Sequence, residues 1–125
     1  MENQYIAGTC NIGTSEKRLR RRVAFLFLIL SAILGVAIFA LVQNPLVRIA
    51  LSPLIFLTAL NFLQSRHSFC VKFGIFKQYN FGEDIGVTAA IVDKESIKKD
   101  RFKSIEIIVY SIVITEIVIG VLLFL

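Results

Sequence analysis

The sequence has 125 residues, 56% of them hydrophobic, and a formal net charge of +5. Its mean hydropathy is +0.75, and soluble domains usually contain only about 45–50% apolar residues, so the composition excludes an ordinary soluble fold. The apolar residues are concentrated in three blocks of about the 20 residues that a bilayer-spanning helix needs. We therefore expect one domain, residues 1–125, of the all-α membrane class with three transmembrane helices.

The chain begins with a polar, basic arm, residues 1–22, which we expect to be cytoplasmic. The first apolar block, residues 23–42, contains no charged residue. As a helix it is about 30 Å long, which suffices to cross a bilayer. A cleaved signal peptide is the competing interpretation, but the apolar run exceeds the ~7–15 residues of such peptides and the preceding polar segment is too long.

The second apolar block, residues 46–63, follows the first after only three residues, so the two helices are expected to form a tight antiparallel hairpin. Asn44 and Pro45 suit a cap and a first helical position, because proline there lacks a donor that would be unpaired anyway. Pro53 lies inside the block, where it removes one backbone hydrogen bond and is expected to bend the helix.

A long cytoplasmic loop, residues 64–104, separates the second block from the third. Within it, Phe69, Phe73 and Phe76 have the spacing of one helical face, which predicts a short amphipathic helix among lipid headgroups. Alternatively, these rings pack on the end of the helical bundle. The sequence leaves both interpretations open.

The third apolar block, residues 105–125, is expected to continue from a helix that begins inside the loop. Asp93 is placed to cap this helix, which then runs through the charged stretch KESIKKDRFKS into the block.

The basic residues predict how the chain is oriented. All Lys and Arg except Arg48 lie before the first block or between the second and the third. Cytoplasmic flanks collect such residues, so we predict a multi-pass inner-membrane protein with a cytoplasmic N-terminus and an external C-terminus. These charges flank apolar blocks, so a nucleic-acid partner is not expected despite the pI near 9.5. The residues expected at lipid headgroups are Arg18, Arg20, Arg21 and Arg22.

A short motif precedes the hairpin. Residues 11–20 contain the pattern NIGxxEKxLR, and the hairpin is followed by Cys70 and by Gly74 four residues later. This pattern resembles the YgaP-type small inner-membrane domain over about residues 11–76. Val71 stands where that family commonly has proline, and the third helix is additional. The resemblance implies a helical hairpin that serves in dimerisation. Family members occur alone or fused to a sulfur-transferring rhodanese, which residues 1–125 do not contain.

The same motif also has a structural interpretation. Gly13 allows a backbone turn, Thr14 or Ser15 can satisfy free amides, and Glu16 in the first turn complements the helix dipole. We favour this interpretation over a phosphate-binding role, because capping signals are common and phosphate sites are rarer.

Two cysteines, Cys10 and Cys70, are expected on the same cytoplasmic side. Cytosolic thiols are usually reduced, so a permanent disulfide is not expected, whereas a transient thiol relay or capture of a soft metal stays open. His67 lies three residues before Cys70, and the three side chains could together hold zinc or copper(I). Closed structural zinc sites use four ligands, so we favour incidental cysteines over this metal site.

Two carboxylates lie in the third block. Glu106 is expected near the inner surface, within reach of Lys103 or Arg66. Glu116 is deep, where an ionisable group costs about 2.5–3.5 kcal/mol, so it should be neutral or paired. Arg48 stands about 10 Å higher by helical rise, which makes a direct pair marginal.

Small residues and Glu116 predict helix association. Ser31 with Gly35 in the first helix, and Gly120 on the stripe of Glu116 in the third, permit close helix approach. A protonated Glu116 bonded to a neighbouring helix, a cationic partner from another subunit and a proton-linked step are the three roles left open for this carboxyl.

No nucleophile, base and oxyanion-hole set and no Gly-rich phosphate loop is visible in the sequence. We therefore predict a non-catalytic integral membrane protein without a cofactor. It would act through helix–helix association, as a homo-oligomer or as an accessory subunit of a larger membrane complex. The alternative is a cytoplasmic-face thiol protein that handles sulfane sulfur or a soft metal. A third hypothesis is a small proton-coupled transporter, which would require oligomerisation.

Overall fold

The computed structural model describes residues 4–125, so residues 1–3 of the predicted arm lie outside the described part. The chain is mostly helical, and three of its segments are long and apolar enough to cross a membrane. That part of the predicted fold class is confirmed. The elements are α1 (Thr14–Leu41), the 3₁₀ helix η1 (Pro45–Leu51), α2 (Ser52–Arg66), α3 (Val71–Ile75), β1 (Gln78–Tyr79), β2 (Ala89–Ala90) and α4 (Lys94–Phe124).

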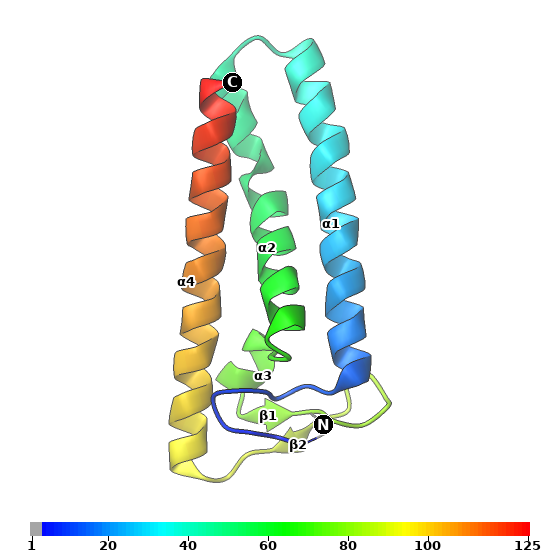
Figure 1. Cartoon of the computed structure of the whole chain (residues 1–125), viewed down its shortest axis with the longest axis vertical. Coiled ribbons are helices and arrows are strands. Elements are labelled where there is room, and N and C mark those ends of the chain that lie inside the picture. The colour runs from blue at the N-terminus through cyan, green and yellow to red at the C-terminus, as the bar shows by residue number, and fades with distance from the viewer. Residues whose placement is uncertain (1–3) are drawn as a thin grey trace.

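The three long helices stand side by side, with α2 between α1 and α4 (Figure 1). Helix α2 packs against both neighbours. The N-terminal arm, α3 and the two short strands gather at one end of the bundle, which we call the N-terminal end. The turn between α1 and η1 and the C-terminus lie at the opposite end, which we call the hairpin end.

Helix α1 begins directly after Gly13, whose N–H donates to the Asn80 carbonyl at 2.8 Å. A Cβ atom at Gly13 would lie 3.1 Å from the Phe81 Cα atom, so this close approach favours glycine. The expected capping by Thr14 or Ser15 is not found, because neither side chain forms a hydrogen bond to the described residues.

The second span differs from the single bent helix that the sequence predicts. Asn44 does act as a cap, since its Oδ1 accepts from the Leu46 N–H at 3.0 Å. The chain then forms a 3₁₀ helix and becomes α-helical only at Ser52. Pro53 consequently lies in the first turn of α2, where a missing N–H leaves no bond unmade. The proline marks a change of helix type instead of a bend within one helix.

Helix α4 runs without interruption from the loop to the hairpin end, as predicted. The Asp93 carboxylate caps it by accepting from the Ser96 N–H at 3.1 Å and from the Ser96 hydroxyl at 2.7 Å. The residues buried along α4 are Asp100, Ser104, Ile107, Ser111, Thr115 and Ile119. The hydroxyls of Ser111 and Thr115 donate to carbonyls four residues earlier, so these small side chains face the bundle without unpaired donors.

The phenylalanines of the loop mostly pack against the bundle. Phe69 is fully buried and Phe73 is 6% exposed, whereas Phe76 is 63% exposed. Helix α3 has only five residues. It packs against α4 so closely that a Cβ atom at Gly74 would collide with the Ser104 hydroxyl. Of the two interpretations of these rings, packing on the bundle therefore holds for Phe69 and Phe73.

Candidate functional site

The N-terminal arm is incorporated into the loop by backbone hydrogen bonds. The N–H groups of Asn11 and Ile12 donate to the Ser68 carbonyl at 3.1 and 3.3 Å. The Asn80 N–H donates to the Asn11 carbonyl at 2.9 Å, and Ile12 pairs with Asn80 in a parallel bridge. The arm thus lies between the turn after α2 and strand β1.

The Asn11 side chain is fully buried and pairs with the backbone of one residue. Its Nδ2 donates to the Cys70 carbonyl at 3.0 Å, and its Oδ1 accepts from the Cys70 N–H at 2.6 Å. A side-chain amide carries both a donor and an acceptor, so this one residue pairs with both backbone polar groups of Cys70, whose carbonyl also accepts from the Gly74 N–H at 3.0 Å. Asn11, the first residue of the NIGxxEKxLR motif, therefore fixes the position of Cys70.

Cys70 is enclosed by protein, with no exposed surface. The Arg20 Nη2 atom donates to its Sγ at 3.1 Å. Its side chain packs with Ile12 and Phe73. The next N–H, that of Val71, donates to the Gln64 Oε1 atom at 2.8 Å. Arg20 contacts this sulfur, and its expected place at lipid headgroups stays a prediction.

Glu16 organises the loop after β1 in addition to standing in the first turn of α1. It is 2% exposed, and its Oε1 accepts from Asn80 Nδ2 at 3.1 Å and from the Gly86 N–H at 2.7 Å. Asn80 Nδ2 also donates to the Asp84 carbonyl at 2.9 Å, and Asn80 Oδ1 accepts from the Gly82 N–H at 3.0 Å. The acid of the motif and Asn80 together fold this loop against α1.

The two thiols lie at the same end of the bundle but have different partners. Cys10 is buried, and its Sγ donates to the Gln4 carbonyl at 3.3 Å, whereas Cys70 accepts from an arginine. Burial, with a smaller effect of Lys103, lowers the pKa of His67 from its usual value. Within residues 4–125, no group of three or more His, Cys, Asp or Glu side chains is arranged to hold a metal ion. The predicted metal set stays a prediction without support from the geometry.

The arm is attached to α4 through Asp100, which is fully buried. The Tyr5 hydroxyl donates to Asp100 Oδ2 at 2.6 Å, and the Gly8 N–H donates to Oδ1 at 2.7 Å. Burial and the hydrogen bond to this carboxylate raise the pKa of Tyr5 above its ordinary value. Nothing in the sequence motif indicates this contact, because the residues are 95 positions apart.

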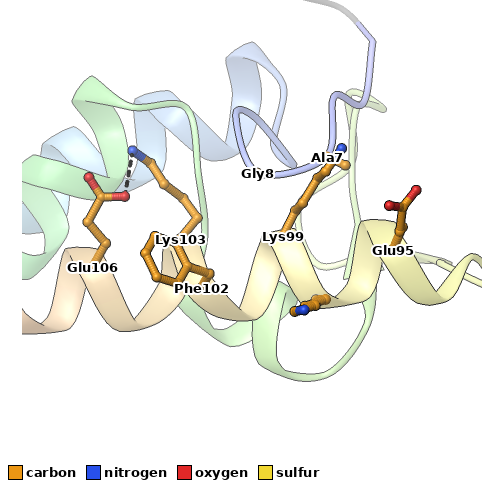
Figure 2. A pocket seen from close by; sticks show the side chains of 8 residues that line it. Ala7, Gly8, Glu95, Lys99, Phe102, Lys103 and Glu106 are labelled. Carbon is orange, nitrogen blue, oxygen red and sulfur yellow. Dashed lines mark ion pairs between the residues drawn. The ribbon is translucent and has the colours of Figure 1, made fainter.

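Beside this attachment, an open cavity of about 670 Å³ lies between the arm and α4 (Figure 2). Lys103 and Glu106 form an ion pair at 3.3 Å on its wall, as Figure 2 shows, which confirms the predicted reach of Lys103. The lining residues are Ala7, Gly8, Glu95, Lys98, Lys99, Phe102, Lys103 and Glu106. Because both signs of charge are present, the cavity shows no preference for one class of ligand.

A smaller cavity of about 260 Å³ lies at the start of α1 and is lined mainly by polar and basic residues. They are Ile12, Gly13, Thr14, Lys17, Arg18, Arg21 and Ser68. Two of the four predicted headgroup residues, Arg18 and Arg21, therefore share one cavity. Arg22 borders a different hollow next to Glu83, which Arg18 also lines. Lys17 and Ser68 also line this cavity and were not predicted as site residues. Ser68 is distant in sequence and is brought here only by the fold.

Glu116 lies on an exposed part of α4. Its carboxylate forms no hydrogen bond or ion pair to the described residues. At 100° per residue it stands about 140° around the axis from the buried Ser111. A Cβ atom at Gly120 would meet no atom within 4 Å. Both residues are thus open to whatever surrounds this bundle.

The small residues of α1 are used within the chain. Gly35 is buried, and a Cβ atom there would contact the Leu51 side chain at 3.8 Å, so it serves the packing of η1 on α1. The Ser31 hydroxyl donates to the Phe27 carbonyl of its own helix at 2.7 Å. Ser31 also borders an apolar hollow of about 450 Å³ that all three long helices line.

Arg48 connects three elements at the hairpin end. Its Nη1 donates to the Leu122 carbonyl at 2.7 Å, and its guanidinium lies 4.2 Å from the centre of the Phe39 ring. It therefore caps α4 and contacts α1, a role that sequence spacing does not indicate. No pair with Glu116 is present among the described residues.

Comparison with protein-family models, with curated proteins and with solved structures finds no match for this chain. The features of the chain that bear on its function are the exposed Glu116 of α4, the buried polar residues Asn11, Glu16 and Asn80 at the N-terminal end, and the basic cavity beside them.

Proposed function

We propose that this is a non-catalytic integral membrane protein that acts by helix association, with the outward face of α4 as its contact surface. The observation that carries the proposal is Glu116, an exposed carboxyl without a partner among the described residues. It lies eleven residues after Ile105, or about 17 Å into an apolar span of about 30 Å. A carboxyl at that depth is costly unless another group satisfies it, and a second chain can supply that group.

The rest of the same face suits close contact. Val109, Val113 and Gly120 stand about 160–200° around α4 from the buried Ser111, on the side of Glu116. The open space at Gly120 lets another backbone approach this face, as small residues do in membrane helix pairs. The partner is a second copy of this chain or a helix of a larger membrane complex. The resemblance to a YgaP-type hairpin, with its implied dimerisation, favours the second copy.

The orientation in the membrane is part of the proposal. Of the 14 Lys and Arg residues, all but Arg48 belong to the arm, the start of α1, the segment between α2 and α4, or the ends of helices near it. We place this N-terminal end in the cytoplasm of an inner membrane and the C-terminus outside, because basic flanks are retained on the cytoplasmic side.

The test is the oligomeric state of the full chain in mild detergent, measured by native mass spectrometry and by crosslinking in membranes. Glu116→Leu should weaken association about tenfold, since such a contact contributes about 1–2 kcal/mol. Glu116→Gln should retain it, because the amide still donates and accepts. The neighbouring exposed residue offers a matched control, Ile117→Leu, which should change nothing.

Unchanged association and partner recovery in Glu116→Leu would sink the proposal for this face. Loss of association in Glu116→Gln, with normal insertion, would instead mean that the ionised carboxylate is required. That result would favour a cationic partner or the proton-coupled transporter over a neutral contact.

Thiol chemistry stays the alternative function. A cationic donor beside a sulfur, as Arg20 is beside Cys70, is a feature of reactive thiol sites. Such sites are also partly accessible, whereas Cys70 has no exposed surface. The geometry therefore supports this alternative less well than association through α4.

A further inference from the structure

The cavity at the start of α1 gathers positive charge without matching negative charge. Lys17, Arg18 and Arg21 all line its volume of about 260 Å³. Within residues 4–125 the one ion pair joins Lys103 to Glu106, so none of these three side chains has a carboxylate within ion-pair distance. The three cations therefore share a space in which an anion would be attracted to all of them.

The nearest acid in the sequence is turned away from this cavity. Glu16 is buried on the other side of the first turn, where its carboxylate accepts from Asn80 and Gly86. It does not line the cavity. The internal use of Glu16 keeps it from neutralising the adjacent basic residues.

Ser68 gives a second and independent indication of a ligand. It is 6% exposed, and its backbone is fully used: the N–H donates to Ser65, and the carbonyl accepts from Asn11 and Ile12. Its hydroxyl, in contrast, has no hydrogen-bond partner among the described residues. Ser68 lines the cavity, so a hydroxyl without a protein partner, on a residue that is 6% exposed, stands beside three cations.

The position along α1 identifies where the anion comes from. Arg21 and Arg18 precede Val23, the start of the uncharged run, by two and five residues, or about 3 and 7.5 Å of helix. The headgroup layer on each side of a bilayer is about 5–8 Å thick, so the cavity lies at the level of lipid phosphates when this run begins the hydrocarbon core.

We propose that this cavity binds the phosphate group of an anionic membrane phospholipid. Two arginines and a lysine offer charge-assisted donors to phosphate oxygens, and the Ser68 hydroxyl adds a neutral one. Basic pockets at the cytoplasmic ends of membrane helices recognise lipid headgroups in this way. The site needs insertion in a membrane, but it does not need association through Glu116.

The test uses the full chain in mild detergent, titrated with phosphatidylglycerol or phosphatidylcholine and followed by native mass spectrometry. Phosphatidylglycerol should bind at one saturable site and more tightly than phosphatidylcholine. Arg21→Gln should weaken this binding about fivefold. Ser68→Ala should weaken it about threefold without lowering thermal stability, because no bond within the protein is lost.

A matched control is Arg22→Gln. It removes a positive charge from the residue that follows Arg21, and the Arg22 side chain does not line the cavity. Its effect should stay within about twofold. If Arg22→Gln weakens binding as much as Arg21→Gln, or if the two lipids bind equally, the proposed site is wrong and only general surface charge is at work.

Inorganic phosphate, added at constant ionic strength, separates lipid from free phosphate as the source. Free phosphate in the millimolar range should not displace phosphatidylglycerol, because it lacks the acyl chains that hold the lipid beside α1. Displacement at that concentration would overturn the lipid as ligand. Repeating the titration with Glu116→Leu should give the same affinity as the unmodified chain, so the two proposals fail independently.

Discussion

At the scale of single residues, the motif NIGxxE proves to be a set of side chains that bind backbone. Its sequence predicts the start of a helix, and α1 does begin at Thr14. What spacing cannot reveal is that Asn11 pairs with Cys70 and that Glu16 holds the loop at Gly86, because these contacts cross 59 and 70 positions of the chain. Helix capping involves residues close together in sequence, whereas a buried polar group can be paired with a residue at any distance along the chain.

The pairing at Asn11 predicts a large loss of stability on substitution. Asn11→Ala would leave the buried Cys70 N–H without a partner and remove one of the two hydrogen bonds to the Cys70 carbonyl, which keeps the bond from the Gly74 N–H. The expected cost is about 2–4 kcal/mol in the free energy of unfolding. Denaturant-induced unfolding of the detergent-solubilised chain would measure it. Asn44→Ala removes an exposed asparagine cap and should cost only about 1 kcal/mol. Equal losses in the two variants would contradict the special role of Asn11.

At the scale of elements, the three long helices could be predicted from the apolar blocks and their helical ends from Asn44 and Asp93. The division of the second span into η1 and α2 could not, because a proline is compatible both with a bend and with a new first turn. Helix α3 is shorter than the phenylalanine spacing suggests, since Phe69 packs against Ile107 of α4 whereas Phe73 packs with Ile12 and Cys70. In both cases the local sequence pattern allowed two interpretations, and tertiary packing determines which one is found.

The attachment of the arm to α4 should depend on pH. The pKa of Tyr5 is raised above its ordinary value, chiefly by burial and then by its bond to Asp100. A group whose pKa is higher in the folded state stabilises fully below its unfolded pKa and loses that effect as pH rises. The stability of the unmodified chain relative to Tyr5→Phe should thus be constant from pH 7 to 9 and fall above pH 10. Melting temperatures of both proteins across this range would show it, and parallel curves would contradict it.

At the scale of the whole molecule, the bundle has two dissimilar ends. The N-terminal end holds the arm, α3, the strands and the buried polar groups, whereas the hairpin end is held by Arg48 against α1 and α4. The sequence predicts this asymmetry from charge alone. It does not reveal that α2 is the central helix. The order in which three helices pack depends on which faces fit one another, and overall composition does not show this.

The orientation proposed for the bundle makes a prediction for the whole chain. Reporter domains fused after Leu125 should read as external, and reporters inserted between Gln78 and Val92 should read as cytoplasmic, because basic residues surround that segment. Alkaline phosphatase and green fluorescent protein fusions in intact cells would measure the two sides. A cytoplasmic reading after Leu125 would overturn the three-span orientation, and with it the placement of both thiols.

The hydrogen bond between Tyr5 and Asp100 also constrains the order of events during synthesis. The two residues are 95 positions apart, so the first described part of the chain must wait until four-fifths of the sequence has been made before it can dock. Helices α1 and α2 are complete long before then and can pair while the arm is still without its partners. The N-terminal end therefore closes only after translation has passed Asp100, and the contact of Arg48 with Leu122 at the hairpin end forms later still.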